Sequence, residues 1–200
     1  MHARITTLSG VTRIDEGVKY LRDEVVRPVQ EQKGYRGLTA SCDREAGIVS
    51  VLTLWETRDD LDASESAVEK VRREAAKAFG GKVESVERYE QIVAEVGQDP
   101  PTAGTRLQIR RIRMDPAKVD ENLEFFKSSV APEILATPGC QGLRQMIDRA
   151  SGQGAVGILW ADNRALEAAN AAHEERRAMA ASRGVEFGEL MEREVLFSAL

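Results

Sequence analysis

The sequence contains few of the residues that most often mark a metal site or a catalytic centre. Its 200 residues include only two histidines, two cysteines and two tryptophans. Cys42 and Cys140 do not form a CxxC pair, so we expect two buried thiols rather than a disulfide or a zinc site. The chain also lacks a GxGxxG or Walker sequence for holding phosphate groups. We therefore expect neither a bound metal nor a cofactor.

Long hydrophobic runs and an excess of positive charge are also missing. No window approaches the roughly 18 uncharged apolar residues that span a bilayer, and residues 1–4 lack the apolar region of a signal peptide. The net charge of −5 argues against a broad basic surface of the kind that binds nucleic acid. We expect a cytoplasmic protein that binds neither membranes nor nucleic acid.

What the sequence does contain is an internal repeat. Several glycine, leucine and tryptophan residues recur at one constant offset of 105 positions. They are Gly34, Gly37, Leu38, Trp55 and Leu61 in the first copy and Gly139, Gly142, Leu143, Trp160 and Leu166 in the second. A unit of about a hundred residues is too long for a solenoid repeat and is typical of a duplicated globular domain. We place the copies at 1–96 and 105–200, joined by the proline-containing linker 97–104.

Hydrophobic periodicity predicts the same order of elements in both copies. The first copy reads as a strand near Ile5 and Thr7, a helix from about Asp15, a hairpin over 37–55, a helix from about Asp59 and a strand over 83–93. The second reads as a strand over 107–109, a helix opened by Asp115-Pro116, a hairpin over 142–160, a helix over 163–182 and a strand over 190–197.

This order, β-α-β-β-α-β, is that of a ferredoxin-like domain in the α+β class. Helices that cover one face of such a sheet leave the other face exposed, and an exposed apolar sheet is an association surface. We therefore predict that two tandem ferredoxin-like domains pair their antiparallel sheets into a pseudo-twofold dimeric α/β barrel. Further homodimerisation is left open.

Each copy resembles the dimeric α/β-barrel superfamily, and in particular its antibiotic-biosynthesis-monooxygenase-like (ABM) branch. The resemblance is carried by residues 34–38, 52–56 and 59–61, and in the second copy by residues 138–143 and 158–160. It speaks for fold more than for chemistry. In the family the tryptophan that ends the hairpin helps to line a pocket between sheet and helices. The resemblance therefore makes Trp55 and Trp160 candidate substrate-binding residues, and core packing is the alternative.

His173 is the one histidine within the predicted elements, and the repeat aligns it with Val68 on the apolar stripe of the first copy. It is our candidate catalytic base, because histidine transfers protons near neutral pH. The alternative is a hydrogen-bonded core residue. Its helix carries alanines where the first copy has bulky residues, which predicts a pocket bounded by Trp160, Asn170 and His173. A helix packed closely on its sheet is the alternative.

Haem-degrading members of the superfamily place a histidine about ten residues beyond the tryptophan and an asparagine on the first strand. Here Asn170 stands ten residues beyond Trp160, and neither first strand supplies an asparagine. Haem degradation is therefore a minor alternative. We predict a cofactor-independent, monooxygenase-like protein that acts on a small aromatic or quinol-type molecule. A non-catalytic, small-ligand-binding or stress-related α/β-barrel protein is the rival hypothesis.

Overall fold

The structure, a computed structural model, describes residues 1–96 and 101–199, except for the side chains of Val96 and of residues 171–176. Part of the predicted linker 97–104 therefore lies outside the described residues. The described chain divides into two compact units. Unit 1 comprises residues 1–88 together with the C-terminal segment from Glu194, and unit 2 comprises Tyr89–Arg193.

The first half of the chain contains four strands and two helical layers in the predicted order. Its elements are β1 (His2–Ser9), α1 (Ile14–Tyr20), the π-helical turn η1 (Leu21–Val25), α2 (Val26–Gln30), β2 (Tyr35–Asp43), β3 (Ile48–Trp55), α3 (Arg58–Ala63), α4 (Glu65–Ala78) and β4 (Lys82–Val96).

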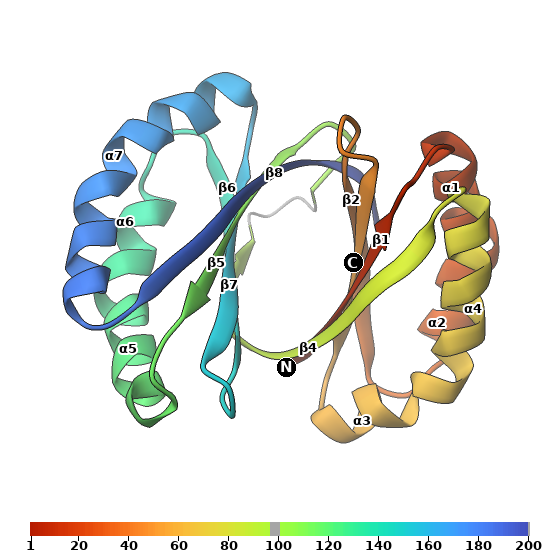
Figure 1. Ribbon diagram of the computed structural model, residues 1–200, viewed down its shortest axis with the longest axis horizontal. Helices are drawn as coiled ribbons and strands as arrows, with labels where there is room; N and C mark the ends of the chain where they lie inside the picture. The colour runs from red at the N-terminus through yellow and green to blue at the C-terminus, as the bar shows by residue number, and fades with distance from the viewer. Residues whose placement is uncertain (97–100, 200) are drawn as a thin grey trace. The chain divides into compact units, whose positions relative to one another are not determined.

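The second half repeats this order. Its elements are β5 (Arg106–Arg113), the 3-10 turn η2 (Pro116–Lys118), α5 (Val119–Phe125), the π-helical turn η3 (Phe126–Val130), α6 (Ala131–Leu135), β6 (Cys140–Asp148), β7 (Gln153–Trp160), α7 (Asn163–Ser182) and β8 (Glu186–Ala199). The predicted succession of ferredoxin-like elements is confirmed, although β8 begins earlier than the expected position 190. In each unit the helices lie on one side of the sheet (Figure 1).

Within each unit, the strands pair in the same register. β3 lies between β1 and β2 with Trp55 opposite His2, and β7 lies between β5 and β6 with Trp160 opposite Arg106. All of these pairs are antiparallel, and β2 and β6 carry a register shift at equivalent places, next to Gly37 and Gly142. The duplication seen in the sequence is therefore also present in the hydrogen bonding of the sheets.

β4 and β8 each extend from one unit into the other. The last residues of β8, 194–199, pair with β2 in unit 1, and residues 90–96 of β4 pair with β6 in unit 2. The hydrogen-bonded strand order, β1-β3-β2-β8-β5-β7-β6-β4, is that of a closed barrel. This strand order confirms the predicted α/β-barrel fold.

Side-chain caps fix where several helices begin. The Asp115 carboxylate accepts a hydrogen bond from the Ala117 amide, as expected for a cap before proline. Thr57 and Asp162 cap α3 and α7 in the same way, each accepting from the amide three residues later. None of the described helices is both long and apolar enough to cross a membrane.

The first helical layer of each unit differs from the predicted single helix. In unit 1 a π-type turn lets the Val26 amide bond the Leu21 carbonyl, and in unit 2 the Ala131 amide bonds the Phe126 carbonyl in the same way. Such a turn inserts one extra residue into the helix and is frequent at functional sites. Residues of both π turns face the inner side of their helical layer, where each unit has a cavity.

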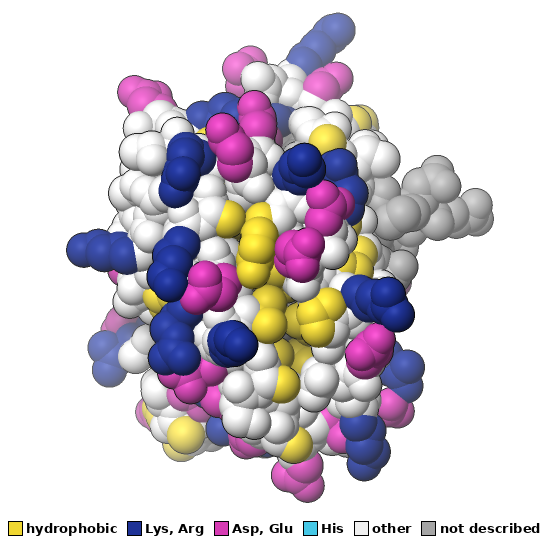
Figure 2. Space-filling view, turned by 90° about the vertical axis from the view of Figure 1, so that its right-hand side faces the viewer, with side chains coloured by type: hydrophobic (Ala, Val, Ile, Leu, Met, Phe, Trp, Pro, Cys, Tyr) yellow, Lys and Arg dark blue, Asp and Glu magenta, His cyan; other side chains and the backbone are white. Residues whose placement is uncertain are grey.

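The core of unit 1 lies between its sheet and helices. Figure 2 faces these helices and shows hydrophobic side chains gathered in a narrow central band, with charged side chains around it. Partly buried Val18 and Val71 pack against the same core cluster as the fully buried Leu61 and Phe79. Unit 2 has an equivalent cluster that contains Phe126, Ile158 and Trp160.

Candidate functional site

Unit 2 contains a cavity of about 100 Å³ between its sheet and its helices. Apolar side chains form most of its wall. They include Ile112 from β5, Phe126 and Val130 from η3, Ile134 from α6, and Val156 and Ile158 from β7. An apolar cavity with a few polar groups is the usual form of a small-molecule site.

Four amide side chains interrupt this apolar wall. Gln108 on β5 donates from Nε2 to Oδ1 of Asn170 on α7 at 2.8 Å. Asn122 on α5 and Gln145 on β6 are only 5% and 2% exposed, and neither Asn122 Oδ1 nor Gln145 Oε1 accepts a hydrogen bond within the described part of the chain. Leaving a buried acceptor unsatisfied costs about 1–3 kcal/mol. These two oxygens therefore mark places where a hydrogen-bond donor from a ligand would be stabilised.

Two arginines complete the polar lining. Arg110 on β5 donates from Nη1 to the Gly188 carbonyl at 3.0 Å, and Arg177 extends from α7. Burial lowers the pKa of Arg110, and the nearby positive charge of Arg177 lowers it further. Neither guanidinium forms an ion pair with a carboxylate among the described residues. The cavity therefore carries positive charge that the described chain does not neutralise.

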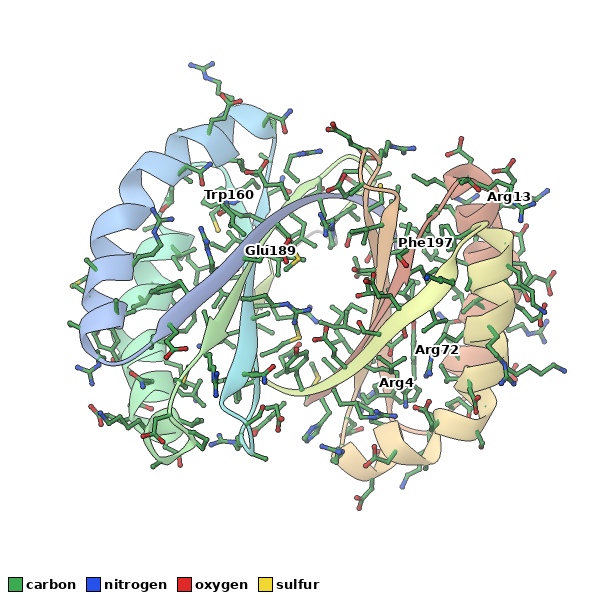
Figure 3. The ribbon with its side chains drawn as sticks, viewed as in Figure 1. Arg4, Arg13, Arg72, Trp160, Glu189 and Phe197 are labelled. Carbon is green, nitrogen blue, oxygen red and sulfur yellow. The ribbon has the colours of Figure 1, made fainter. Side chains whose placement is uncertain are left out.

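The equivalent place in unit 1 is filled by a charge cluster. Arg4 lies two strand positions from the residue opposite Trp55, as Gln108 does relative to Trp160. Its Nη2 lies 2.9 Å from Oε2 of Glu65, and Arg72 and Arg88 approach the same carboxylate at 2.9 and 2.8 Å. Figure 3 shows Arg4 and Arg72 within unit 1. Both line a smaller cavity of about 40 Å³.

Arg4 is held firmly in this cluster. It also donates to the Leu61 carbonyl at 2.6 Å and to Ser64 Oγ at 3.1 Å, and its side chain is only 1% exposed. Burial lowers the pKa of Arg4 to about 10, and the Glu65 charge partly opposes this effect. Because the three arginine guanidinium groups of this cluster already pair with Glu65, unit 1 offers a charged ligand less than unit 2 does.

One aromatic ring fills the space between two helices of unit 1. Phe79 is fully buried in unit 1 and packs so closely on α1 that a Cβ at Gly17 would lie 2.1 Å from the ring. Phe79 is the C-cap residue of α4, whereas the C-cap residue of α7 is Arg183, and Gly17 corresponds to Asn122 at the repeat offset. The ring that fills unit 1 therefore has no counterpart at that position of unit 2.

The predicted pocket of the second copy was attributed to the alanines of α7. Ala180 does line the cavity, but Ala169 is fully buried in the core cluster of unit 2 and is absent from the cavity lining. The polar lining was largely missed. A comparison of the repeats would have pointed to it, because Glu65 becomes Asn170 while its partner Arg72 is kept as Arg177.

Of the predicted site residues, Asn170 lines the cavity. Trp160 ends β7 shortly before α7 and is fully buried in the core cluster next to the cavity, without lining it (Figure 3). His173 belongs to α7, but its side chain lies outside the described residues. The catalytic role of His173 stays a prediction.

Trp55 is fully buried in unit 1. It donates its indole N–H to Thr53 Oγ1 at 3.0 Å and meets the Tyr35 ring edge-on at 6.0 Å. The Arg4 guanidinium lies 5.5 Å from the Trp55 ring centre. These contacts describe a packed and hydrogen-bonded side chain, and the substrate-binding roles of Trp55 and Trp160 stay predictions.

Both cysteines are free thiols. Burial raises the pKa of Cys42 to about 11 and also raises the pKa of Cys140, so both favour the less reactive protonated form. Among the described residues, no group of three or more histidine, cysteine, aspartate or glutamate side chains is placed to hold a metal ion.

Sequence comparison finds relatives of the chain in Mycobacterium tuberculosis. It is 31% identical to the uncharacterized protein Rv2557 of strain H37Rv over 155 residues, which cover 76% of this chain and 68% of the relative. The chain belongs to the Rv2557 family. The uncharacterized protein Rv2558 of the same strain is 29% identical over 158 residues, covering 78% of this chain and 66% of that protein. No family model matches the chain.

Solved structures with low sequence identity share the fold. A candidate monooxygenase from Lactobacillus acidophilus aligns with a TM-score of 0.71 at 9% identity, covering 99% of this chain and 95% of its own. An anthrone oxidase-like protein aligns with a TM-score of 0.65 at 16% identity, covering 99% of this chain and 92% of its own. A ferredoxin-fold protein from Listeria monocytogenes, related to antibiotic biosynthesis monooxygenases, aligns with a TM-score of 0.52 at 10% identity. The alignment covers 96% of this chain and 93% of that protein. The chain thus has the ABM-like fold that its sequence resembles.

Proposed function

We propose that this protein binds a small, hydroxylated aromatic molecule in the unit 2 cavity and oxidises it with dioxygen without a cofactor. The observation that carries the proposal is the combination of an apolar cavity with two buried amide oxygens, Asn122 Oδ1 and Gln145 Oε1, that accept no hydrogen bond within the described chain. A ligand hydroxyl is the kind of donor that such oxygens require.

The cavity wall suits an aromatic ring. Phe126 and Ile158 offer apolar surface, and Trp160 supports this wall from the same core cluster. Burying an aromatic ring there removes apolar area from water at about 25 cal/mol per Å². Asn170, fixed by its hydrogen bond to Gln108, presents a further polar contact at the helix side of the cavity.

Oxidation would begin with removal of a proton from the bound hydroxylated ring. The resulting anion is electron-rich enough to reduce dioxygen directly, and the positive charge of Arg110 and Arg177 would stabilise it. In the overall balance, a ring C–H ortho or para to the hydroxyl becomes a carbonyl and the hydroxyl becomes a second carbonyl. One oxygen atom of dioxygen is kept, and the other leaves as water with the C–H and O–H hydrogen atoms. This step requires no electron donor other than the substrate.

His173 is the proposed proton acceptor. It stands three residues after Asn170 and four before Arg177, and residues at these helical spacings share a face. Asn170 and Arg177 both line the cavity. An unperturbed imidazole has a pKa of roughly 6.5 and is suited to accept a proton near neutral pH.

Two structural relatives have names that fit the proposed reaction class. A candidate monooxygenase and an anthrone oxidase-like protein share this fold over nearly the whole chain. Their identities of 9% and 16% carry the fold alone, so the substrate class rests on the cavity. The proposal also places the protein in the cytoplasm. Its proposed partner is a small aromatic molecule.

Oxygen consumption with anthrone-like and quinol-like compounds tests the proposal. We expect His173→Ala to lower the rate by about a hundredfold or more, the usual contribution of a general base. Ala180→Phe should abolish binding by filling the cavity, whereas Ala178→Phe, an exposed position on the same helix, should leave it unchanged.

Two outcomes would contradict parts of the proposal. Equal behaviour of the Ala180 and Ala178 variants in a binding assay would show that the ligand does not occupy this cavity. Binding that is lost in Ala180→Phe without any oxygen consumption by the wild type would favour the non-catalytic binding protein. Circular dichroism would establish that each variant is folded.

A further inference from the structure

We infer that the ligand of the unit 2 cavity carries a carboxylate, which pairs with Arg110 and Arg177. This inference rests on the proposed function, because it defines the ligand class of the same cavity more narrowly. It makes the preferred ligand a hydroxylated aromatic acid rather than a neutral quinol.

Unit 1 has a carboxylate at a position where unit 2 lacks one. In unit 1, Glu65 neutralises Arg72 at 2.9 Å. Ten residues after the other tryptophan, unit 2 has Asn170 instead, while the arginine seventeen residues after it is retained as Arg177. Asn170 is engaged with Gln108, the residue at the strand position of Arg4. Unit 2 thus replaces one ion pair with a neutral amide pair and leaves Arg177 without the carboxylate.

Unit 2 also has a cation that unit 1 lacks at the equivalent strand position. Arg110 stands opposite Val156 on β7, as Thr6 stands opposite Val51 on β3, so unit 2 has an arginine where unit 1 has a threonine. Arg110 and Arg177 line the same cavity. Two like charges on one cavity repel each other, and the charge of Arg177 accordingly lowers the pKa of Arg110. A ligand carboxylate would relieve this repulsion and gain charge-assisted hydrogen bonds.

The buried amides add a second, independent requirement. Asn122 and Gln145 are at least nine-tenths buried, and each has an oxygen without a donor in the described chain. Those oxygens select for a ligand hydroxyl, whereas the arginines select for a negative charge. A neutral ligand with a hydroxyl would satisfy the amide oxygens and leave the two arginines without a negative partner. Together, the two requirements describe an aromatic ring with a hydroxyl and a carboxylate.

Two probes of matched shape test the inference, namely 6-hydroxy-2-naphthoate and 6-hydroxy-2-naphthamide. Calorimetric titration of the full chain at pH 7 should show the acid binding on the order of tenfold or more tightly, as expected for hydrogen bonds to charged groups. Arg177→Gln and Arg110→Gln should each remove most of this preference. Asn170→Glu, which restores the unit 1 carboxylate, should remove it as well.

Controls separate charge from folding. Arg164→Gln changes an exposed arginine near the start of α7 and should leave both affinities unchanged. Arg110→Lys retains the positive charge and should keep part of the preference for the acid. If Arg110→Lys lost the preference as completely as Arg110→Gln, the loss would come from misfolding rather than from the missing charge.

Equal affinities for the two probes, or arginine variants that weaken both probes alike, would overturn the inference. The proposed function would survive that result if anthrone-like or quinol-like compounds still bound and Ala180→Phe abolished their binding. If none of these compounds bound to the folded wild-type protein, both proposals would fail.

Discussion

Glu65 is the shared ion-pair partner of three arginines in unit 1. Arg4, Arg72 and Arg88 all direct a guanidinium nitrogen to within 2.9 Å of its carboxylate oxygens. Arg4 is almost fully buried, so its charge depends on this partner far more than an exposed arginine would. A carboxylate that pairs with three cations at once is expected to contribute more than an ordinary surface ion pair.

We therefore predict that Glu65→Asn lowers the free energy of unfolding by about 1–3 kcal/mol, because it leaves a buried charged group without its partner. The double variant Arg4→Gln/Glu65→Asn copies the amide pair Gln108–Asn170 of unit 2 and should recover part of that loss. Urea denaturation measures both values. A double variant no more stable than Glu65→Asn would show that the two pairs are not interchangeable.

The same carboxylate should make stability depend on pH. Burial alone would raise the pKa of Glu65, but the hydrogen bond from Arg72 and the charges of Arg4, Arg72 and Arg88 outweigh it, so the pKa falls below its ordinary value of 4.5. The stabilisation is therefore present above pH 4.5 and is lost as the pH falls through the folded-state pKa. The stability difference between wild type and Glu65→Asn should shrink across that acidic range and stay constant near neutral pH.

At the scale of elements, one ring joins the helical layer of unit 1. Phe79 follows α4 and packs on α1 at Gly17, where no side chain could be added without displacing the ring. We predict that Phe79→Ala costs about 3–5 kcal/mol of stability, because it leaves a cavity between two helices. Gly184→Ala, one residue beyond the C-cap of α7 in unit 2, has open space around it and should cost only about 1–2 kcal/mol for its left-handed backbone. Similar losses in thermal or urea unfolding would contradict this difference in packing.

The sequence predicted the elements better than it predicted the cavity. Repeat spacing and hydrophobic period were enough to place both hairpins and their closing tryptophans, because these signals are local. The π turns at Leu21 and Phe126 were not predicted, since one inserted residue barely disturbs a helical pattern. The inward direction of Gln108 and Gln145 depends on strand register, and the cavity depends on how side chains far apart in the sequence pack.

At the scale of the whole molecule, the compact units do not coincide with the sequence repeats. The repeats were placed at 1–96 and 105–200, whereas unit 1 includes the C-terminal segment from Glu194 and unit 2 begins at Tyr89. β2 in unit 1 pairs with residues 194–199, and β6 in unit 2 pairs with residues 90–96. Each unit is thus completed by a strand segment that belongs to the other repeat.

This exchange predicts how the chain behaves when it is divided at the linker. A fragment of residues 1–96 would expose the edge of β2, and a fragment of residues 105–200 would expose the edge of β6, because each lacks its partner strand segment. We expect each fragment alone to unfold at lower temperature and less cooperatively than the full chain. A mixture of the two should recover a cooperative transition and elute as a one-to-one complex on size-exclusion chromatography. If fragment 1–96 alone matched the full chain in thermal unfolding followed by circular dichroism, the exchanged strands would be dispensable, and each sequence repeat would be a self-sufficient folding unit.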